Sequence, residues 1–398
     1  MNRRERPQAG QAGRPPRGYE QSGKATFAHD VAVHGAGIVG RTLALELAAQ
    51  GLEVALLAPA AAAASRPDLR AYALNAASLT LLQRLRVWDQ LPAGAATPVL
   101  EMRIRGDAPG STLGFSAWQQ RVEQLAHIVD AAALEATLAD AVRYAPRVHP
   151  LAAEARVEAA LHAWCDGRHS RGRAQVGAGF VAHPYGHTAV AARLVGTEPH
   201  AGVAHQWFRA PDVLALLPCD AVAPGCGCGW GLVWSLPQAR AQALLDAEPA
   251  AFEAELAAAT GGELGALALA GARAGWPLQL GRAERVAGPG WALLGDAAHV
   301  VHPLAGQGLN LGLGDVAALA RVLAGREAWR APGDERVLAR YARERAAPVA
   351  DMAWVTDGLL HLFAAELPGV RALRNRGLAL VERLPPLKRW LAARALAA

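Results

Sequence analysis

The chain has 398 residues, more than one ordinary hydrophobic core accommodates, so we expect two domains or a core with an appended lobe. Hydrophobic residues make up 52% of the chain, together with 41 glycines and 25 prolines, and this composition excludes a disordered protein. The formal charge of +5 does not indicate nucleic-acid binding, because lysine occurs only at positions 24 and 388 and the arginines are scattered except at the ends.

The first 27 residues are rich in arginine, glycine, proline and glutamine and are predicted to be a disordered tail. No apolar core follows their arginines and no apolar run is long enough to span a membrane, so we expect a cytoplasmic protein. Peripheral contact with the inner membrane stays open, because apolar residues recur around Trp390. Cys226 and Cys228 lack a second ligand pair, and no metal site is predicted.

The chain then predicts a strand, a glycine-rich turn, a helix over 42–50 and a second strand over 53–57. The turn carries Gly35, Gly37 and Gly40 in the spacing G-x-G-x-x-G, which allows a tight turn and close approach of the backbone to a pyrophosphate. In this context a dinucleotide site is favoured over a plain connection. No carboxylate stands at the end of the second strand, around Ala58, where one ordinarily binds the adenosine ribose, so adenine-side affinity is expected to be weaker or supplied by backbone.

Periodicity next predicts a helix over 76–91, a strand pair within 96–122 and a helix over 131–142. From Val190 to Leu280 the composition shifts to strands and connecting helices that carry several tryptophans, which is typical of an antiparallel sheet with one buried face. Residues 331–398 are predicted to be largely helical.

The most informative segment is 293–315, in which an apolar strand ends at Gly295-Asp296. A proline-stiffened turn and the glycines Gly306 and Gly308 follow, and then a helix begins. A carboxylate suits a polyol hydroxyl, and the N–H groups of a helix N-terminus suit an electron-rich carbonyl edge. A flavin dinucleotide has both groups, so this segment predicts a flavin site.

The glycine fingerprint, Asp166-Gly167 and Gly295-Asp296 together resemble the motif set of the flavin-dependent aromatic-ring hydroxylases with the p-hydroxybenzoate hydroxylase fold. The stretches 70–78, 185–189, 199–208 and 355–378 are similar to the members of that family that act in ubiquinone biosynthesis. This resemblance implies an α/β fold with a Rossmann-like FAD-binding domain, an inserted antiparallel-sheet substrate domain and a C-terminal helical segment.

The implied domain boundaries are discontinuous. The FAD-binding domain takes 28–95, 123–183 and 281–330, the substrate domain takes 96–122 and 184–280, and the helical segment takes 331–398. One departure from the family lies at 143–165, where relatives build a longer strand meander, so we expect a meander strand to be shortened or lost.

The resemblance also implies residue roles. The predicted FAD-binding residues are Gly35, Gly37, Gly40, Arg70, Asp166, Gly295, Asp296, Pro303, Gly306, Gln307, Gly308, Leu309 and Asn310. The predicted catalytic residues, which flank or form the flavin loop, are His299, His302 and Pro303. A largely apolar substrate pocket is expected between loop 303–310 and the sheet, lined by Trp207, Leu214, Leu216 and Trp234.

The predicted activity is that of an FAD-dependent, NAD(P)H-using monooxygenase in which a flavin hydroperoxide transfers one oxygen atom to an aromatic ring. A prenylated phenol of ubiquinone biosynthesis is the favoured substrate, and a soluble phenol or a polyketide is the first alternative. The second alternative is a degenerate flavin-fold subunit that scaffolds a biosynthetic complex, and it is motivated by Ala58 and the short segment 143–165. The predicted partner is therefore a small aromatic molecule. Whether this molecule carries a lipid tail, and whether the protein joins a biosynthetic complex or forms a homodimer, is left open.

Overall fold

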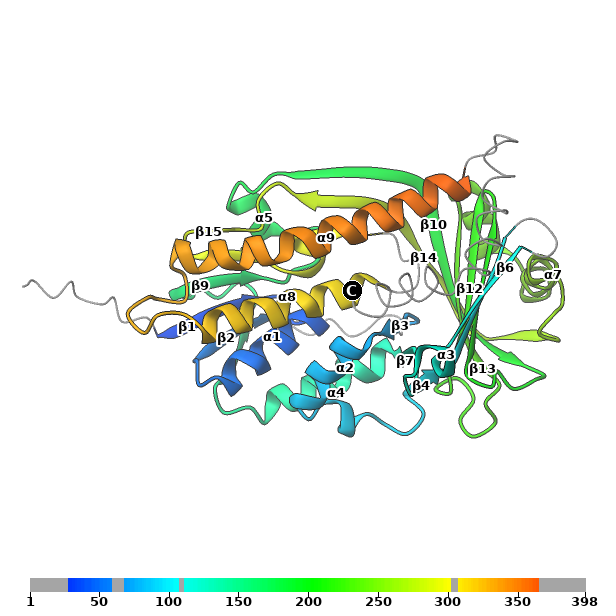
Figure 1. Cartoon of the computed structure of the whole chain (residues 1–398), viewed down its shortest axis with the longest axis horizontal. Coiled ribbons are helices and arrows are strands. Elements are labelled where there is room, and N and C mark those ends of the chain that lie inside the picture. The colour runs from blue at the N-terminus through cyan, green and yellow to red at the C-terminus, as the bar shows by residue number, and fades with distance from the viewer. Residues whose placement is uncertain (1–27, 59–67, 107–110, 302–306, 365–398) are drawn as a thin grey trace, which may run out of the picture.

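The computed structural model describes residues 28–58, 68–106, 111–301 and 307–364, without the side chains of 353–364. The predicted disordered tail and the predicted helices beyond residue 364 lie outside these residues. Two lobes are visible in Figure 1, with the long helices α8 and α9 along one of them and a large sheet in the other. None of the helices in the described ranges combines the length and the apolar character that a membrane span requires.

The first lobe is built on a largely parallel sheet. Within the described residues its strands lie in the order β15-β16-β9-β1-β2-β8, and every neighbouring pair is parallel except β15 and β16. The strands are β1 His29–His34, β2 Val54–Ala58, β8 Val148–Ala152, β9 Ala159–Trp164, β15 Ala287–Gly288 and β16 Trp291–Leu293. This sheet confirms the Rossmann-like part of the predicted fold.

Long helices cover one face of the parallel sheet. They are α1 Ile38–Ala49, α4 Ala131–Arg143, α8 Gln307–Ala324 and α9 Glu335–Ala364. In α1, Leu43 and Leu47 lie one turn apart on the same face, and both belong to one core with Val31 and Val33 of β1. The fingerprint turn between β1 and α1 is therefore fixed by packing on both sides.

A short extended link covers the opposite face of the parallel sheet. Residues 153–158 lead from β8 to β9, and Ala155 and Val157 pack against small residues such as Ala32. No meander strand stands between β8 and β9 in this described stretch, as expected from the short segment 143–165. Because these sheet residues are small, the link 153–158 lies close to the sheet and itself covers this face.

The second lobe contains the predicted antiparallel sheet. Its strand order within the described residues is β17-β14-β10-β13-β12-β11-β5-β6, and only β11 and β5 run parallel. The strands are β5 Glu101–Arg105, β6 Thr112–Ser116, β10 Phe180–Gly196, β11 Val203–Arg209, β12 Asp212–Pro218, β13 Gly229–Pro237, β14 Leu267–Ala283 and β17 His299–Val300. The long strands β10 and β14 run back from this sheet to the first lobe (Figure 1).

A small sheet with the strand order β3-β7-β4 lies between the two lobes (Figure 1). Its strands are β3 Ala71–Leu74, β7 Ala126–Asp130 and β4 Ala96–Val99. Along β3 the side chains alternate, so that Tyr72 and Leu74 pack against the core of the first lobe while Ala71 and Ala73 face the second. This strand therefore brings residues 70–74 to the boundary between the lobes.

The shorter helices complete the fold. They are α2 Ala76–Arg84, α3 Ala117–Gln120, α5 Arg171–Gln175, α6 Gln238–Asp246 and α7 Pro249–Thr260. The helix predicted over 76–91 is shorter than expected, because Arg86 adopts a left-handed φ of 57° and the chain continues as a 3₁₀ turn, Trp88–Gln90. In Figure 1, α7 lies on the side of the large sheet that faces away from the first lobe.

Candidate active site

The glycine fingerprint forms a cradle at the N-terminus of α1. Gly35 has a left-handed φ of 104°, and a Cβ there would meet the carbonyl oxygen of Cys165, while a Cβ at Gly40 would collide with the carbonyl oxygen of Gly35. Open space surrounds Gly37, which begins α1 without a side-chain cap and without an acidic residue in the first turn. The first N–H groups of α1 are therefore available to an anion such as a pyrophosphate.

Asp166 lies beside this cradle, immediately after β9. Its Oδ2 accepts hydrogen bonds from the N–H groups of Arg171 and Gly172 at 2.8 and 3.2 Å, at the start of α5. Its Oδ1 is buried and has no hydrogen-bond partner among the described residues. An unsatisfied buried carboxylate oxygen next to Gly35 is the type of acceptor that a ligand hydroxyl would satisfy.

Asp296 is placed by a 3₁₀ turn, Gly295–Ala297, that follows β16. Residues 292–299 are buried except for Asp296, whose side chain is exposed, so the turn points this one carboxylate outward. Tyr72 of β3 lies close enough for the charge of Asp296 to contribute to its raised pKa, whose main cause is burial. The carboxylate therefore faces the region where β3 meets the first lobe.

The beginning of α8 is tied to the segment 73–78 by Asn310. The amide of this buried side chain donates to the carbonyl of Ala73 at 2.7 Å, and its Oδ1 accepts from the N–H of Asn75 and the hydroxyl of Ser78. The side chain of Asn310 is thus bonded to protein, so only the backbone of this residue remains to face a cofactor. Leu309 packs in the core, while Gln307 and Gly308 are part-exposed at the first turn of α8.

Arg70 lies at the entrance to β3 and is only partly buried. Its Nε donates to Oδ1 of Asp68 at 2.9 Å, and its guanidinium lies over the ring of Tyr72, 5.5 Å from the centroid. The charge of Arg70 is thus paired with Asp68, and its contact with FAD stays a prediction. Tyr72 was missed by the sequence reasoning, although it lies inside the motif 70–78.

These groups fit an FAD molecule. A free helix N-terminus suits its pyrophosphate, the unsatisfied Oδ1 of Asp166 and the exposed carboxylate of Asp296 suit hydroxyl groups, and the glycines leave room for close approach. No carboxylate stands at the end of β2, because its last residue is Ala58. Residues 59–67, which follow it, lie outside the described residues. His302, Pro303 and Gly306 also lie outside the described residues, and their roles stay predictions.

His299 is oriented toward the protein interior. Its side chain is 3% exposed, and its Nε2 lies 2.7 Å from Oδ2 of Asp315 in α8. A cavity of about 270 Å³ borders His299, but it contains none of the predicted FAD-binding residues. The imidazole thus binds a buried carboxylate, and the catalytic role of His299 stays a prediction.

The four predicted substrate-binding residues lie on the wrong face of the large sheet. Trp207, Leu214, Leu216 and Trp234 are buried in a core with Phe252 of α7 and other residues of α6 and α7. The opposite pleat faces the first lobe, because Ala215 and Val233 pack with Ala71 of β3. The prediction assigned the bulky apolar residues to the pocket, whereas the sheet uses them as a core beneath α6 and α7.

Arg193 of β10 joins the two lobes and was also missed. Its side chain is largely buried, and its Nη2 lies 2.6 Å from Oδ2 of Asp130 and 2.9 Å from the carbonyl oxygen of Arg70. Its Nη1 lies 3.0 Å from Sγ of Cys219. Arg193 thus fixes the backbone just before β3.

Comparison with known proteins agrees with this geometry. A family model described as an FAD binding domain matches residues 28–111 and 118–355. The ubiquinone hydroxylase UbiL of Rhodospirillum rubrum is 32% identical over 95% of this chain and 92% of its own length. The 3-demethoxyubiquinol 3-hydroxylase of Escherichia coli is 32% identical over 90% of this chain and 96% of its own length.

Solved structures share the fold. A probable FAD-dependent monooxygenase of Pseudomonas aeruginosa, PqsL, superposes with a TM-score of 0.70 at 21% identity, covering 88% of this chain and 99% of its own. HpxO of Klebsiella pneumoniae, complexed with FAD and uric acid, superposes with a TM-score of 0.69 at 17% identity, covering 92% and 98%. The predicted fold class is confirmed.

Proposed function

Because the chain belongs to the family of FAD-dependent aromatic hydroxylases that includes the ubiquinone hydroxylases, we propose that it hydroxylates a prenylated phenol in ubiquinone biosynthesis, with NAD(P)H as electron donor. Its similarity to two hydroxylases of this class over nearly the full length of all three chains carries the proposal. Bound FAD would supply the oxygen chemistry, for which this chain offers the groups that place the cofactor.

Each part of the site has a proposed task. The N-terminus of α1 binds the pyrophosphate through its N–H groups, and Asp296 accepts hydrogen bonds from the hydroxyls of the ribityl chain. The N-terminus of α8 would hold the carbonyl edge of the ring and would stabilise negative charge there. Orientation of the ring thus depends on two helix termini and one carboxylate.

The proposed substrate wall is the pleat of the large sheet that faces the first lobe. It consists of small side chains where β10 and β13 pair, in contrast to the bulky opposite pleat. The residues of this wall are Ala189, Ala191, Val233 and Ser235. Small side chains here would leave more room for a substituted aromatic ring than the bulky residues of the opposite pleat.

The test combines the protein with a strain that lacks its gene. We expect the purified protein to be yellow, to bind one FAD and to consume NADH or NADPH faster when a prenylated phenol is added. Mass spectrometry of lipid extracts from the deletion strain should reveal an under-hydroxylated quinone precursor. An unchanged quinone profile would exclude the ubiquinone role, and a phenol response without that precursor would favour a soluble substrate.

Asp296→Ala supplies the matching site test. Loss of the exposed carboxylate should weaken FAD binding at least tenfold, measured by titrating apoprotein with FAD. Asp140→Ala, which removes an exposed carboxylate from α4, serves as the control and should bind FAD like the parent. Equal affinity in both variants would contradict the proposed role of Asp296.

A further inference from the structure

A lone buried carboxylate stands in the helix that begins at the flavin site. Asp315 is the only acidic residue of α8, and its side chain is 1% exposed. Its neighbours on the helix are mostly core residues such as Leu313, Val316 and Leu319. A charge buried among apolar side chains is costly unless donors surround it, so its partners reveal what it does.

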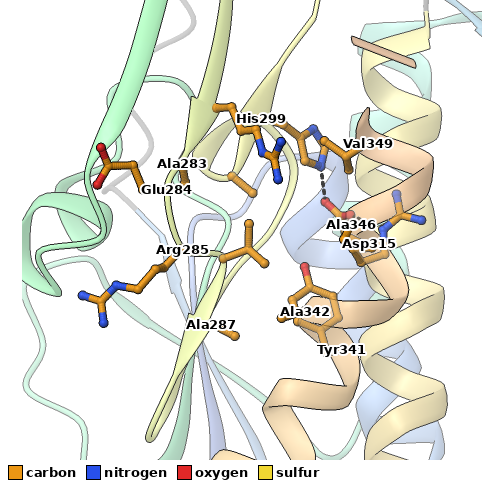
Figure 2. Close-up of a pocket in the computed structure, with 14 residues that line it drawn as sticks. Ala283, Glu284, Arg285, Ala287, His299, Asp315, Tyr341, Ala342, Ala346 and Val349 are labelled. Carbon is orange, nitrogen blue, oxygen red and sulfur yellow. Dashed lines mark hydrogen bonds and ion pairs between the residues drawn. The ribbon is translucent and has the colours of Figure 1, made fainter. Parts of the chain in front are cut away.

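Three donors from three different elements converge on Asp315. Its Oδ2 accepts from the N–H of Gly295 at 2.8 Å and lies 2.7 Å from Nε2 of His299, as Figure 2 shows for the histidine. Its Oδ1 accepts from Nε of Arg345 in α9 at 2.6 Å. Arg345 also donates to the carbonyl of Leu311 at 3.0 Å, so α9 is joined to α8 at two points.

The first two donors belong to the segment that carries Asp296. Gly295 immediately precedes Asp296 and has a left-handed φ of 59°, and His299 follows three residues later. Gly312, one turn before Asp315, lets the helix approach this segment, since a Cβ there would lie 3.3 Å from the Cα of Gly295. Asp315 therefore binds this segment on both sides of Asp296, at Gly295 and at His299.

Packing alone does not hold this arrangement. A cavity of about 270 Å³ lies where α9 meets the end of β14, and His299, Asp315 and Arg345 all line it. Nδ1 of His299 is buried and has no partner among the described residues. With space on that side, the polar contacts rather than close packing fix the positions of His299 and Arg345.

We propose that Asp315 is a positioning residue for FAD: with His299 and Arg345 it holds the Gly295-Asp296 turn in the orientation that binds the cofactor. The ion pair with Arg345 makes α9 part of the support of the flavin site. This role concerns cofactor binding and does not depend on which phenol is the substrate.

The test is FAD affinity in Asp315→Asn, which keeps the volume and removes the charge. Apoprotein titrated with FAD should show a Kd at least tenfold higher than that of the parent, about 1.4 kcal/mol. The visible absorption and circular dichroism of the fully loaded variant should also change, because a displaced turn alters the surroundings of the ring. The matched control is Arg321→Gln, which breaks the surface ion pair with Glu344 between the same two helices.

The control should retain the parent's Kd and spectra. A folded Asp315→Asn protein whose Kd lies within twofold of the parent, with unchanged spectra, would overturn the proposal even if its melting temperature falls. If Asp315→Asn does not fold, Arg345→Met decides instead, because it leaves Gly295 and His299 bound to Asp315. We expect a Kd at least threefold higher for Arg345→Met, and a parental Kd and spectrum would overturn the proposal.

Discussion

Arg193 illustrates how one buried side chain controls the boundary between the lobes. It stands on β10 of the large sheet, while its partners Asp130 and the carbonyl of Arg70 belong to the small sheet and the segment before it. Asp130 also accepts the N–H of Ala133 at 2.9 Å and so caps α4. The guanidinium matches these acceptors because its donors diverge in a plane.

Replacing Arg193 with methionine should strongly destabilise the protein. The substitution keeps an apolar stem but leaves the carboxylate of Asp130 and a backbone carbonyl without their donor, at a cost of about 3–5 kcal/mol in unfolding free energy. Urea denaturation measures this loss. In the control, Arg103→Met, an exposed pair with Glu101 is broken, and the expected change is below about 1 kcal/mol. Equal effects in the two variants would show that Arg193 is not a structural tie.

At the scale of elements, the side chain of Asn310 holds the segment 73–78 against the beginning of α8. Asn75 caps α2 by accepting the N–H of Ser78 at 2.8 Å, and the amide of Asn310 then bonds to both of these residues and to Ala73. The side chain predicted to line the cofactor thus sets the distance between α8 and β3.

Asn310→Ala should therefore lower both stability and FAD affinity. Three hydrogen bonds in the interior are lost and their partners stay buried, so we expect about 2–4 kcal/mol less unfolding free energy. FAD affinity should fall because α8 and β3 shift relative to each other, and an FAD titration checks this. Thr80→Ala, which removes an exposed hydroxyl that bonds to Ala76 within α2, should change neither quantity measurably.

What the sequence could predict depended on how local the signal was. The glycine-rich turn after a strand and Asp296 at the end of a strand were predicted without the fold, because each pattern lies within one continuous stretch, 31–40 and 293–315. The substrate face was not, because β12 carries apolar residues on both pleats, Val213 and Leu214 alike, and only the position of α6 and α7 tells which pleat is core.

Asp315 was missed for a related reason. A lone acid in an apolar helix signals a buried contact, but its donor Arg345 lies 30 residues away in the chain and could not be paired with it by spacing. The same holds for Arg193 and Asp130, whose partnership requires β10 to lie against β7. Long-range polar pairs depend on the arrangement of the whole chain.

At the scale of the whole molecule, each lobe contains a histidine whose pKa is lowered well below its ordinary value. In the first lobe, burial and then the nearby His162 lower the pKa of His34 to about 4. In the second, burial and then the guanidinium of Arg105 lower the pKa of His205 to about 4. His205 is nearly fully buried, with Arg105 3.0 Å from its Nδ1 and Trp207 stacked on its ring, whereas His34 is part-exposed.

These histidines predict a loss of stability as the pH falls from 6.5 toward 4. In the unfolded chain they take up a proton near pH 6.5, but in the folded protein only near pH 4, so acid favours the unfolded state across this window. Each contributes a slope of at most about 1.4 kcal/mol per pH unit, and the part-exposed His34 contributes less. Carboxylates with lowered pKa values, such as Asp315, add to the loss of stability below about pH 5, so the histidines are compared above that pH.

Urea unfolding at pH 7.5, 6.0 and 5.0 tests this expectation with His205→Gln. The glutamine cannot be protonated, so the variant should lose less stability than the parent between pH 6.5 and 5, whatever its stability at pH 7.5. His183→Gln, which replaces an exposed histidine of β10, should keep the parent's slope. If His205→Gln keeps that slope as well, His205 is not buried in its neutral form and the packing of Trp207 and Arg105 around it must differ in solution.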